Sequence, residues 1–270
     1  MHITNQISQL FYKFANTQFS PSIQNIINNG YVKLLGLDMS EFKNPTEYKS
    51  LNELFTRELI IQRDYDTTED TFISPTDSFV TAIGDIKQDI SLQIKGMYYN
   101  ISDLLTNHCN IKERNLLNGK FANFYLSPKD YHRYHLPFNC QINKLIHIPG
   151  KLYPVNFRYL NKKSNLFLEN ERVVLECQTS NNKYFYMVFV GALNVGKMVF
   201  TFEPNIETNN EENQNIKVYE YNDLHLKKGD CLGYFKMGST VLIFWEKDFI
   251  ELENIENTKI RFGETIAKIK

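Results

Sequence analysis

The chain contains few of the features that mark secreted, metal-stapled or membrane-spanning proteins. Its cysteines are widely spaced and form no Cys-x-x-Cys pair: Cys109, Cys140, Cys177 and Cys231. This spacing argues against a zinc cluster or a disulfide framework and favours free thiols in a reducing compartment. Residues 1–30 have neither the basic start nor the apolar block of a signal peptide. No run approaches the roughly 18 apolar residues of a membrane-spanning helix, so we expect a soluble or peripheral cytoplasmic protein.

An excess of charge of one sign is also missing. The formal net charge is -1, which gives no reason to expect a nucleic-acid partner. Tryptophan is scarce, with one residue against 20 Phe and 16 Tyr, a composition that favours strands and amphipathic surfaces. At 270 residues and 42% hydrophobic composition the chain is able to bury a substantial core, as one large domain or two small ones.

Apolar residues in the first part of the chain recur at helical spacing. They form three faces, made of Ile7, Leu10, Phe11 and Phe14, then Ile23, Ile26, Ile27 and Leu34, then Leu51, Leu54, Phe55 and Leu59. Ser50 is a plausible N-cap for the third helix. Such faces usually pack on a core; the alternative is that part of this surface lies on a bilayer, with Lys13 and Lys33 near the headgroups.

Beyond about residue 70 the pattern changes to short strand-like runs punctuated by glycine and proline. The runs are 121–126, 142–148, 172–177, 184–190, 198–202 and 239–245, and a short helix is expected at 101–105. The polar tract 207–215 reads as an exposed loop. We therefore predict an α+β fold, in which residues 1–60 form an N-terminal helical layer and residues 61–270 form a predominantly antiparallel β domain.

Met237-Gly238-Ser239-Thr240 precedes the apolar run 241–245 and is ordinarily a turn that leads into a strand. A strained Gly-Ser bond also lets a serine hydroxyl reach the preceding carbonyl, because glycine tolerates unusual backbone angles and leaves that carbonyl uncrowded. The Ser239 hydroxyl would need a base to take its proton. His135 is the candidate base, and a carboxylate is expected to orient it.

His135 belongs to a dense segment, Asp130-Tyr131-His132-Arg133-Tyr134-His135. Two histidines three residues apart suit one face of a helical turn, where they would bind a metal. A third ligand at suitable spacing is missing, so we predict no metal site. Arg133 either holds a phosphate or carboxylate or supports the turn.

This segment, extended to Leu136-Pro137, together with Met237-Gly238-Ser239-Thr240-Val241, resembles the bacterial phosphatidylserine decarboxylase family. Further blocks match in the same order along most of the chain. They are Ser74-Pro75-Thr76-Asp77, Gln93-Ile94-Lys95-Gly96, Pro149-Gly150-Lys151-Leu152-Tyr153-Pro154-Val155-Asn156, Asn170-Glu171-Arg172-Val173 and Val190-Gly191-Ala192-Leu193-Asn194-Val195-Gly196.

The resemblance implies roles for individual residues. Asp77 stands where the family has the acid of a self-processing triad, with His135 as its base and Ser239 as its nucleophile. His132 matches a position associated with decarboxylation. Family members often have glycine after the aspartate, whereas this chain has Ser78.

The resemblance also implies a proenzyme that cleaves itself between Gly238 and Ser239. The expected products are a large subunit, 1–238, and a small subunit, 239–270, that together form a heterodimer. Ser239 would become a covalent pyruvoyl cofactor, so that neither PLP nor a metal is required. The pyruvoyl group would form a Schiff base with phosphatidylserine and release CO2 and phosphatidylethanolamine, with His132 or His135 returning a proton.

A diacyl lipid does not readily leave the bilayer, since each exposed methylene costs about 0.8 kcal/mol. We therefore expect the protein to be peripheral, at the cytoplasmic face of the cell membrane. Two readings from other classes compete: an uncleaved serine hydrolase that uses Ser239, His135 and Asp77, and a non-catalytic membrane-binding homologue. The hydrolase reading lacks a Gly-x-Ser-x-Gly elbow. A third possibility keeps the pyruvoyl chemistry but uses a related serine-headed lipid.

Overall fold

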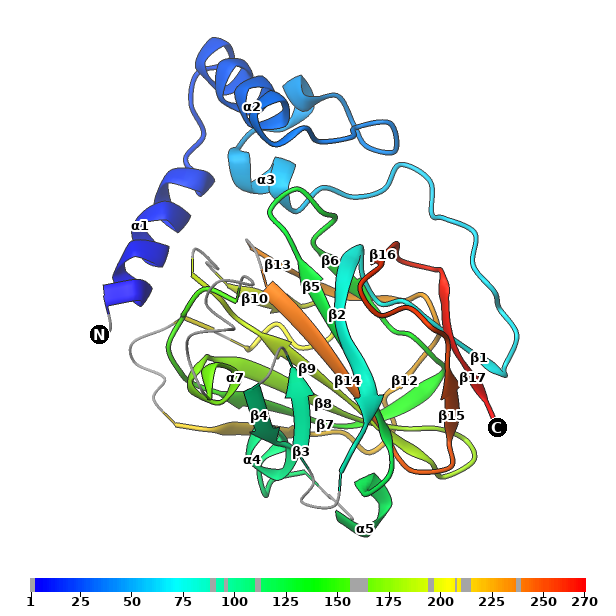
Figure 1. Ribbon diagram of the computed structural model, residues 1–270. Helices are drawn as coiled ribbons and strands as arrows, with labels where there is room; N and C mark the ends of the chain where they lie inside the picture. Colours follow the sequence, from blue (N-terminus) through cyan, green and yellow to red (C-terminus); the bar gives the residue numbers. More distant parts are fainter. Residues whose placement is uncertain are drawn as a thin grey trace.

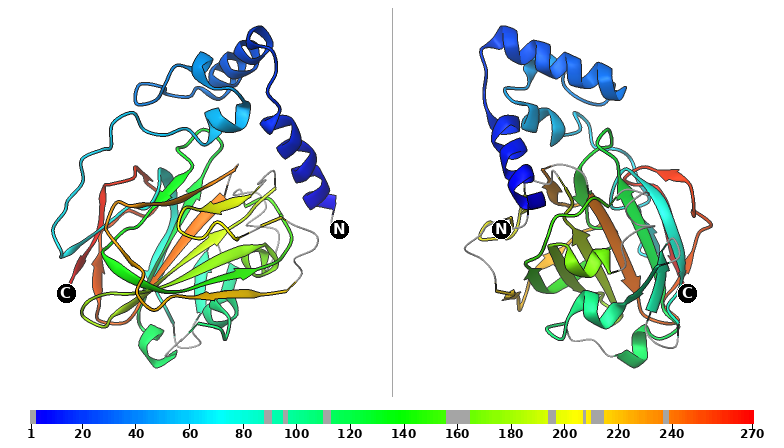
Figure 2. Two further views of the ribbon diagram at one scale, coloured as in Figure 1. Left: turned by 180° about the vertical axis from the view of Figure 1, so that it is seen from behind. Right: turned by 60° about the vertical axis from the view of Figure 1, so that its left-hand side comes forward.

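Helices at the start of the chain lie at one end of a β-rich body in the computed structural model (Figure 1). The structure describes residues 3–87, 91–94, 97–109, 113–155, 165–193, 197–206, 208–209, 215–236 and 239–270. The helices are α1 (Ile3–Asn16), α2 (Pro21–Leu35), η1 (Pro45–Glu47), α3 (Leu51–Phe55), α4 (Ile101–Leu105), α5 (Glu113–Leu116) and α7 (Leu166–Glu169). Two further views show the N-terminal helices at one end and α5 at the opposite end (Figure 2).

A large antiparallel sheet forms the centre of the body. Its strand order is β11-β7-β8-β9-β14-β5-β2-β16, with β12 also paired to β7. The strands are β2 (Ser78–Asp85), β5 (Lys120–Leu126), β7 (Cys140–Ile148), β8 (Arg172–Gln178), β9 (Tyr184–Val190), β11 (Lys217–Glu220), β12 (His225–Leu226), β14 (Ser239–Trp245) and β16 (Lys259–Ile260). Every strand pair described in this sheet is antiparallel.

Three smaller sheets complete the β structure. One has the order β1-β17-β15, from Thr71–Ile73, Thr265–Ile269 and Ile250–Leu252. Another has the order β10-β13-β6, from Met198–Phe200, Cys231–Phe235 and Arg133–His135. The third pairs β3 (Ser91–Ile94) with β4 (Met97–Asn100). The α+β class and the mainly antiparallel sheet predicted from the sequence are therefore confirmed.

Strand β14 lies in the middle of the large sheet, between β9 and β5, and all its residues are buried. Side chains alternate across a sheet, so the strand serves two cores. Val241, Ile243 and Trp245 belong to one hydrophobic cluster, whereas Leu242 and Phe244 belong to the other. A strand covered on both faces reads as a continuous apolar run, which is what 241–245 shows.

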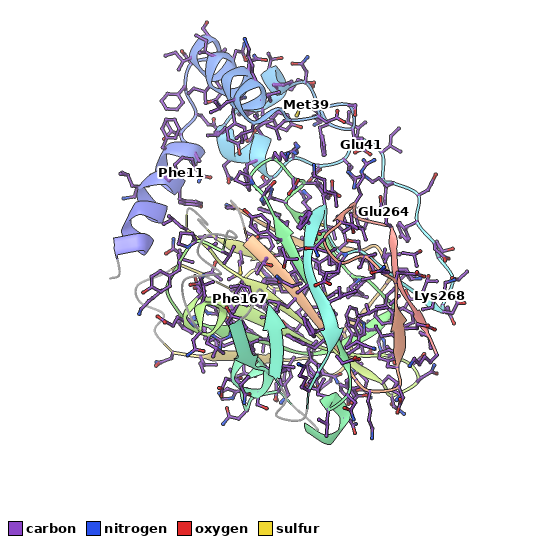
Figure 3. The ribbon with its side chains drawn as sticks, viewed as in Figure 1. Phe11, Met39, Glu41, Phe167, Glu264 and Lys268 are labelled. Atoms are coloured by element: carbon purple, nitrogen blue, oxygen red, sulfur yellow. The ribbon has the colours of Figure 1, made fainter. Side chains whose placement is uncertain are left out.

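The N-terminal helices use their apolar residues in two ways. Leu51, Leu54 and Phe55 of α3 are buried, and Ser50 caps that helix by accepting a hydrogen bond from the Glu53 amide. This confirms the predicted N-cap and the core positions of Leu51, Leu54 and Phe55, whereas Leu59, predicted on the same helical face, lies beyond the end of α3. Figure 3 shows Met39 and Glu41 in the segment that follows α2, above the strands.

Helix α2 has the opposite arrangement, because its buried residues are the polar Gln24 and Asn28. They bond to each other, and Asn28 donates to the carbonyls of Pro45 and Tyr48. Apolar side chains of α1 and α2 remain exposed instead: Leu10, Phe14, Ile23, Ile26 and Leu34. Packing on the core therefore does not account for most of the apolar face predicted over 23–34.

The histidine segment is not a helical turn. Arg133–His135 forms strand β6, and His132 precedes it. The expectation of two histidines on one helical face is wrong, because the segment pairs with β13 rather than closing local hydrogen bonds. Short runs carry no reliable sign of such pairing. None of the described helices is both long and apolar enough to cross a bilayer.

Candidate active site

Ser239 is the first residue of β14, opposite Leu126 at the end of β5. Its side chain is fully buried, and among the described residues none forms a hydrogen bond with its Oγ atom. A buried hydroxyl without a partner loses the hydrogen bonds that water would give it. Met237 and Gly238 lie outside the described residues, so the structure gives no geometry for the predicted scission bond.

His132 follows a turn that Asp130 closes, since the Asp130 carboxylate accepts hydrogen bonds of 2.7 Å from both the amide and the hydroxyl of Ser127. His132 Nδ1 lies 2.8 Å from the Asp130 carbonyl oxygen, which only accepts, so Nδ1 carries the proton. The lone pair on Nε2 is therefore free, and this atom is buried with no partner in the described part of the chain. The ring packs on Phe55 with 3.9 Å between centroids.

Complete burial lowers the pKa of His132 to about 3, and the Arg57 charge acts in the same direction. The imidazole is therefore neutral at physiological pH. A neutral ring with an open lone pair is able to accept a proton.

His135 lies on β6, where its amide donates to the Pro75 carbonyl at 2.9 Å. Nδ1 donates to the Gly229 carbonyl at 2.9 Å, which leaves Nε2 to accept a 3.1 Å hydrogen bond from the Tyr131 hydroxyl. The ring stacks on Phe262 at 3.6 Å between centroids and 15° between planes. Burial lowers the pKa of His135 to about 4, so this imidazole is neutral as well.

Asp77 is bound by other partners than His135. Arg63 contacts both carboxylate oxygens, at 2.5 and 2.9 Å, and the Phe262 amide donates to Oδ1 at 2.8 Å. Phe262 thus contacts both Asp77 and His135. Its amide donates a hydrogen bond to Asp77, and its ring stacks on the imidazole of His135. No hydrogen bond is described between the two predicted triad members themselves.

His132 and Ser239 are connected through Phe235, but no contact between their side chains is described. The Phe235 amide donates to the His132 carbonyl at 3.0 Å, and a span of four residues limits the Phe235–Ser239 Cα separation to about 14 Å. His135 instead lines a pocket of about 320 Å³ that also includes Tyr131, Gly229 and Phe262. Ser239, His132 and Asp77 do not line this pocket.

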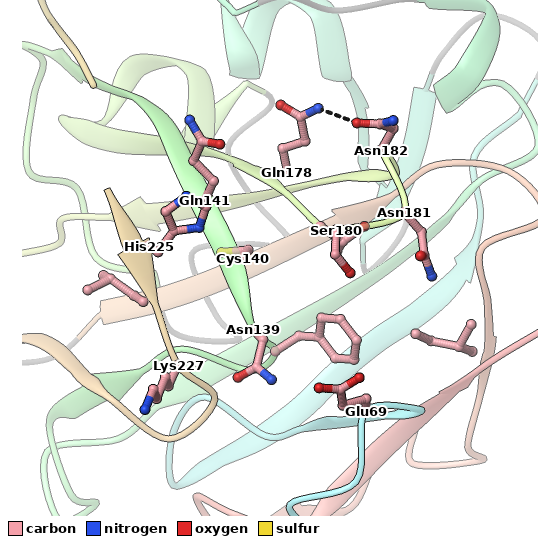
Figure 4. Close-up of a pocket in the computed structure, with 14 residues that line it drawn as sticks. Glu69, Asn139, Cys140, Gln141, Gln178, Ser180, Asn181, Asn182, His225 and Lys227 are labelled. Atoms are coloured by element: carbon pink, nitrogen blue, oxygen red, sulfur yellow. Dashed lines mark hydrogen bonds between the residues drawn. The ribbon is translucent and has the colours of Figure 1, made fainter. Parts of the chain in front are cut away.

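A second pocket, of about 550 Å³, contains none of the predicted site residues (Figure 4). Its lining is mostly polar and includes Asn139, Gln141, Gln178, Asn182 and His225. Within the described ranges, no group of three or more His, Cys, Asp or Glu side chains is arranged to hold a metal ion.

Sequence reasoning missed several residues that shape this site. Tyr131 was counted only as part of the aromatic segment, and Arg57, Arg63 and Phe262 were not singled out at all. Tyr131 bonds to His135 only four residues on, but the other three make their contacts with distant residues, for example Phe262 with Asp77. Contacts between distant segments leave no pattern in the local sequence. The sequence offered one signal of a binding or ion-pairing role here, the two arginines at 57 and 63.

Taken together, fold and site define an α+β protein with a buried serine hydroxyl and two buried neutral imidazoles, a set suited to nucleophilic and acid–base chemistry. A profile of the family described as phosphatidylserine decarboxylase matches residues 51–268. The chain therefore belongs to the phosphatidylserine decarboxylase family, whose members are carboxy-lyases. This confirms the resemblance inferred from the sequence.

Individual relatives match almost end to end. A phosphatidylserine decarboxylase proenzyme of Campylobacter jejuni is 42% identical, over 99% of this chain and 100% of the relative. One of Helicobacter pylori (strain 26695) is 41% identical over 98% of this chain and 97% of the relative. One of Nitrosospira multiformis is 32% identical over 94% and 89%.

Proposed function

We propose that this protein converts phosphatidylserine to phosphatidylethanolamine and CO2 in phospholipid biosynthesis, after cleaving itself between Gly238 and Ser239. The observation that carries the proposal is the buried Ser239 hydroxyl, which has no hydrogen-bond partner among the described residues. A structural serine would normally satisfy its hydroxyl, whereas a nucleophile must keep it available. Membership of a family whose relatives are called proenzymes supports the same reading.

In the maturation step, His135 takes the proton of Ser239 while Oγ attacks the Gly238 carbonyl carbon, so the peptide bond becomes an ester. Removal of the Ser239 α-proton then breaks the Cβ–O bond and leaves a carboxylate on Gly238. The dehydroalanine that remains tautomerises and reacts with one water, releasing ammonia and forming the pyruvoyl group. In the described state the Tyr131 hydroxyl occupies His135 Nε2, so this hydrogen bond must open first.

The surroundings of Ser239 fit a pyruvoyl group, because its Oγ is fully enclosed and would break no hydrogen bond to any of the described residues. Once formed, that group supplies the carbonyl that condenses with the substrate amine and accepts the electron pair left by CO2. In this proposal His132 or His135 holds a proton and returns it to the substrate. The Phe55 and Phe262 rings pack against the imidazoles of His132 and His135, respectively.

After cleavage the two pieces would remain one molecule. The fragment 239–270 contains β14, which is hydrogen-bonded to β9 on one side and β5 on the other. It also contains β17, which pairs with β1. Separating the subunits would expose the buried side chains of β14 and break both ladders, so a stable heterodimer is expected.

The exposed apolar residues of α1 and α2 suit a membrane surface. Ile26 and Leu34 are 73% and 82% exposed, and Lys13 and Lys33 are exposed on the same helices. Apolar side chains with neighbouring lysines match an interfacial helix on anionic lipid. We place this surface on the cytoplasmic face of the cell membrane, where the lipid substrate is available.

The intact mass of the purified wild-type protein under denaturing conditions tests the processing step. Two masses are expected, for 1–238 and for 239–270 with a pyruvoyl group in place of its first residue. Ser239→Ala should give one uncut chain and no CO2 release from phosphatidylserine. A single uncut chain in an active wild-type preparation would refute the proposal of self-cleavage.

A further inference from the structure

Arg57 is a buried cation whose hydrogen bonds are incomplete. It follows α3, and only 3% of its surface is exposed. Its Nη2 atom donates to the carbonyls of Lys129 at 3.0 Å and Asp130 at 3.3 Å. Nε and Nη1 are also buried, and among the described residues none accepts a hydrogen bond from either. A guanidinium stays charged throughout the physiological pH range. Its buried N–H donors are therefore destabilising unless an acceptor binds them.

The described part of the chain supplies no carboxylate for Arg57. The other arginines of this region are ion-paired, Arg63 with Glu41 and Asp77, and Arg133 with Glu58. No ion pair to Arg57 is described, and the nearby Asp130 carboxylate is bonded to Ser127. The fold therefore satisfies one end of the Arg57 guanidinium and leaves positive charge at the other.

The position of Arg57 ties it to the candidate site. The Asp130 carbonyl that accepts from Arg57 also accepts from His132 Nδ1 at 2.8 Å. Phe55, two residues before Arg57, packs on the His132 ring. The Arg57 guanidinium carbon lies 4.5 Å from the centroid of the Phe42 ring. The open donors thus belong to a side chain that shares its anchoring oxygen with a site histidine.

We propose that Arg57 binds the phosphodiester of the lipid substrate through its open N–H groups. The inference rests on the proposed function, because it takes its ligand from that reaction. Phosphate oxygens accept several charge-assisted hydrogen bonds, which suits a guanidinium with more than one free donor. Arg57 also lies just after α3, within the N-terminal layer whose exposed apolar residues we propose for the membrane surface.

The substrate carries a second anion, its carboxylate, but the chemistry argues against that choice. The carboxylate must lose its charge as CO2 departs, so an arginine bound to it would stabilise the starting state more than the transition state. The phosphodiester keeps its charge throughout the reaction. An interaction with the phosphodiester therefore strengthens substrate binding without opposing the chemical step.

Kinetics with a short-chain, soluble phosphatidylserine test the proposal in the mature enzyme. Arg57→Gln should raise KM about 10- to 100-fold, as for a lost hydrogen bond to a charged group, with kcat changed about threefold at most. Arg57→Lys should recover part of the loss. Short-chain phosphatidylethanolamine, which keeps the phosphodiester but lacks the carboxylate, should have its inhibition constant raised by the same factor as KM. The control Lys129→Gln removes an exposed cation from the same loop and should change neither constant.

Each other outcome has a distinct meaning. A raised KM with an unchanged inhibition constant for phosphatidylethanolamine would assign Arg57 to the carboxylate and overturn the proposal. A lower kcat with both constants unchanged would show that Arg57 acts only through the Asp130 carbonyl and His132, which also overturns it. Absence of CO2 release by the wild-type protein would instead refute the proposed function.

If neither Arg57 variant folds and matures, a crystal structure of the wild-type enzyme with short-chain phosphatidylethanolamine decides. The proposal requires phosphodiester oxygens within about 3.2 Å of Arg57 nitrogens. A phosphodiester bound elsewhere in that complex would refute it.

Discussion

Arg63 binds both carboxylate oxygens of Asp77, at 2.5 and 2.9 Å, with side chains that are only 11% and 17% exposed. The same guanidinium also contacts Glu41, in the segment after α2. The acid that the family resemblance assigns to self-processing is thus held by a residue that also reaches the N-terminal part of the chain. This geometry gives Asp77 a structural role, which experiment can separate from the processing role that the resemblance predicts.

Asp77→Asn and Arg63→Gln distinguish these roles. Either change breaks the same ion pair and should lower the free energy of unfolding by about 2 kcal/mol. This is less than the cost of breaking a fully buried ion pair, because both partners are partly exposed. Only Asp77→Asn removes the carboxylate, so it should also slow cleavage at 238–239 by at least about 100-fold. Thermal melting and the time course of fragment formation measure the two effects. Equal slowing in both variants would reduce Asp77 to a structural residue.

His132→Asn and His135→Asn should fail at different steps. If His135 is the base of maturation, its variant stays uncut, with cleavage slowed about 100- to 10,000-fold. The His132 variant should mature but lose a comparable factor in CO2 release. Gel analysis of cleavage and a CO2 assay on the matured fraction separate the two. The reverse result would make the free Nε2 lone pair of His132 the processing base.

Protein stability should fall as the pH drops from 7.5 to 5.5. His132 and His135 have pKa values of about 3 and about 4 when folded, against about 6.5 in an unfolded chain. Between these values the unfolded state binds more protons, so acid favours unfolding. The two histidines leave the free energy of unfolding unchanged above pH 6.5, the pKa of histidine in the unfolded chain. Below that pH the free energy of unfolding falls, by about 1.4 kcal/mol per histidine at pH 5.5.

Uncut Ser239→Ala protein suits this measurement, since it is one chain. Adding His132→Asn should reduce the fall in melting temperature between the two pH values by about 4 °C. A fall of the same size with and without His132 would contradict its burial as a neutral ring.

Ile26→Glu with Leu34→Glu should weaken binding to vesicles that contain anionic phospholipid. Burial of one such side chain is worth about 1.5–3 kcal/mol, so a loss of more than 10-fold is expected. Vesicle flotation measures it. The matched control is Ile216→Glu with Val218→Glu, which adds the same charge at two exposed apolar residues, one just before β11 and one in it, and should leave binding unchanged. Equal loss in the control would indicate simple charge repulsion from the lipid.

Some regular elements were predictable because their signals are local, whereas strands such as β1, β2 and β17 were not predicted. The runs 184–190 and 239–245 were expected with the same bounds as β9 and β14, and the short helix 101–105 with those of α4. The helical reading of the two histidines failed because the pairing of β6 with β13 is non-local. The predicted roles of Asp77, His132, His135 and Ser239, like the limits of the two predicted domains, stay predictions that the experiments above test.

By itself the sequence determined the α+β class and the family, since spacing, periodicity and the order of matched blocks are written along the chain. Tertiary structure decided which groups are buried and what each one contacts. In the folded protein His135 is hydrogen-bonded to Gly229 and Tyr131, and Asp77 is bound by Arg63. The Ser239 hydroxyl and two donor atoms of Arg57 have no hydrogen-bond partner among the described residues. Burial and hydrogen bonding depend on residues brought together from distant segments, and these set the protonation and availability of each group.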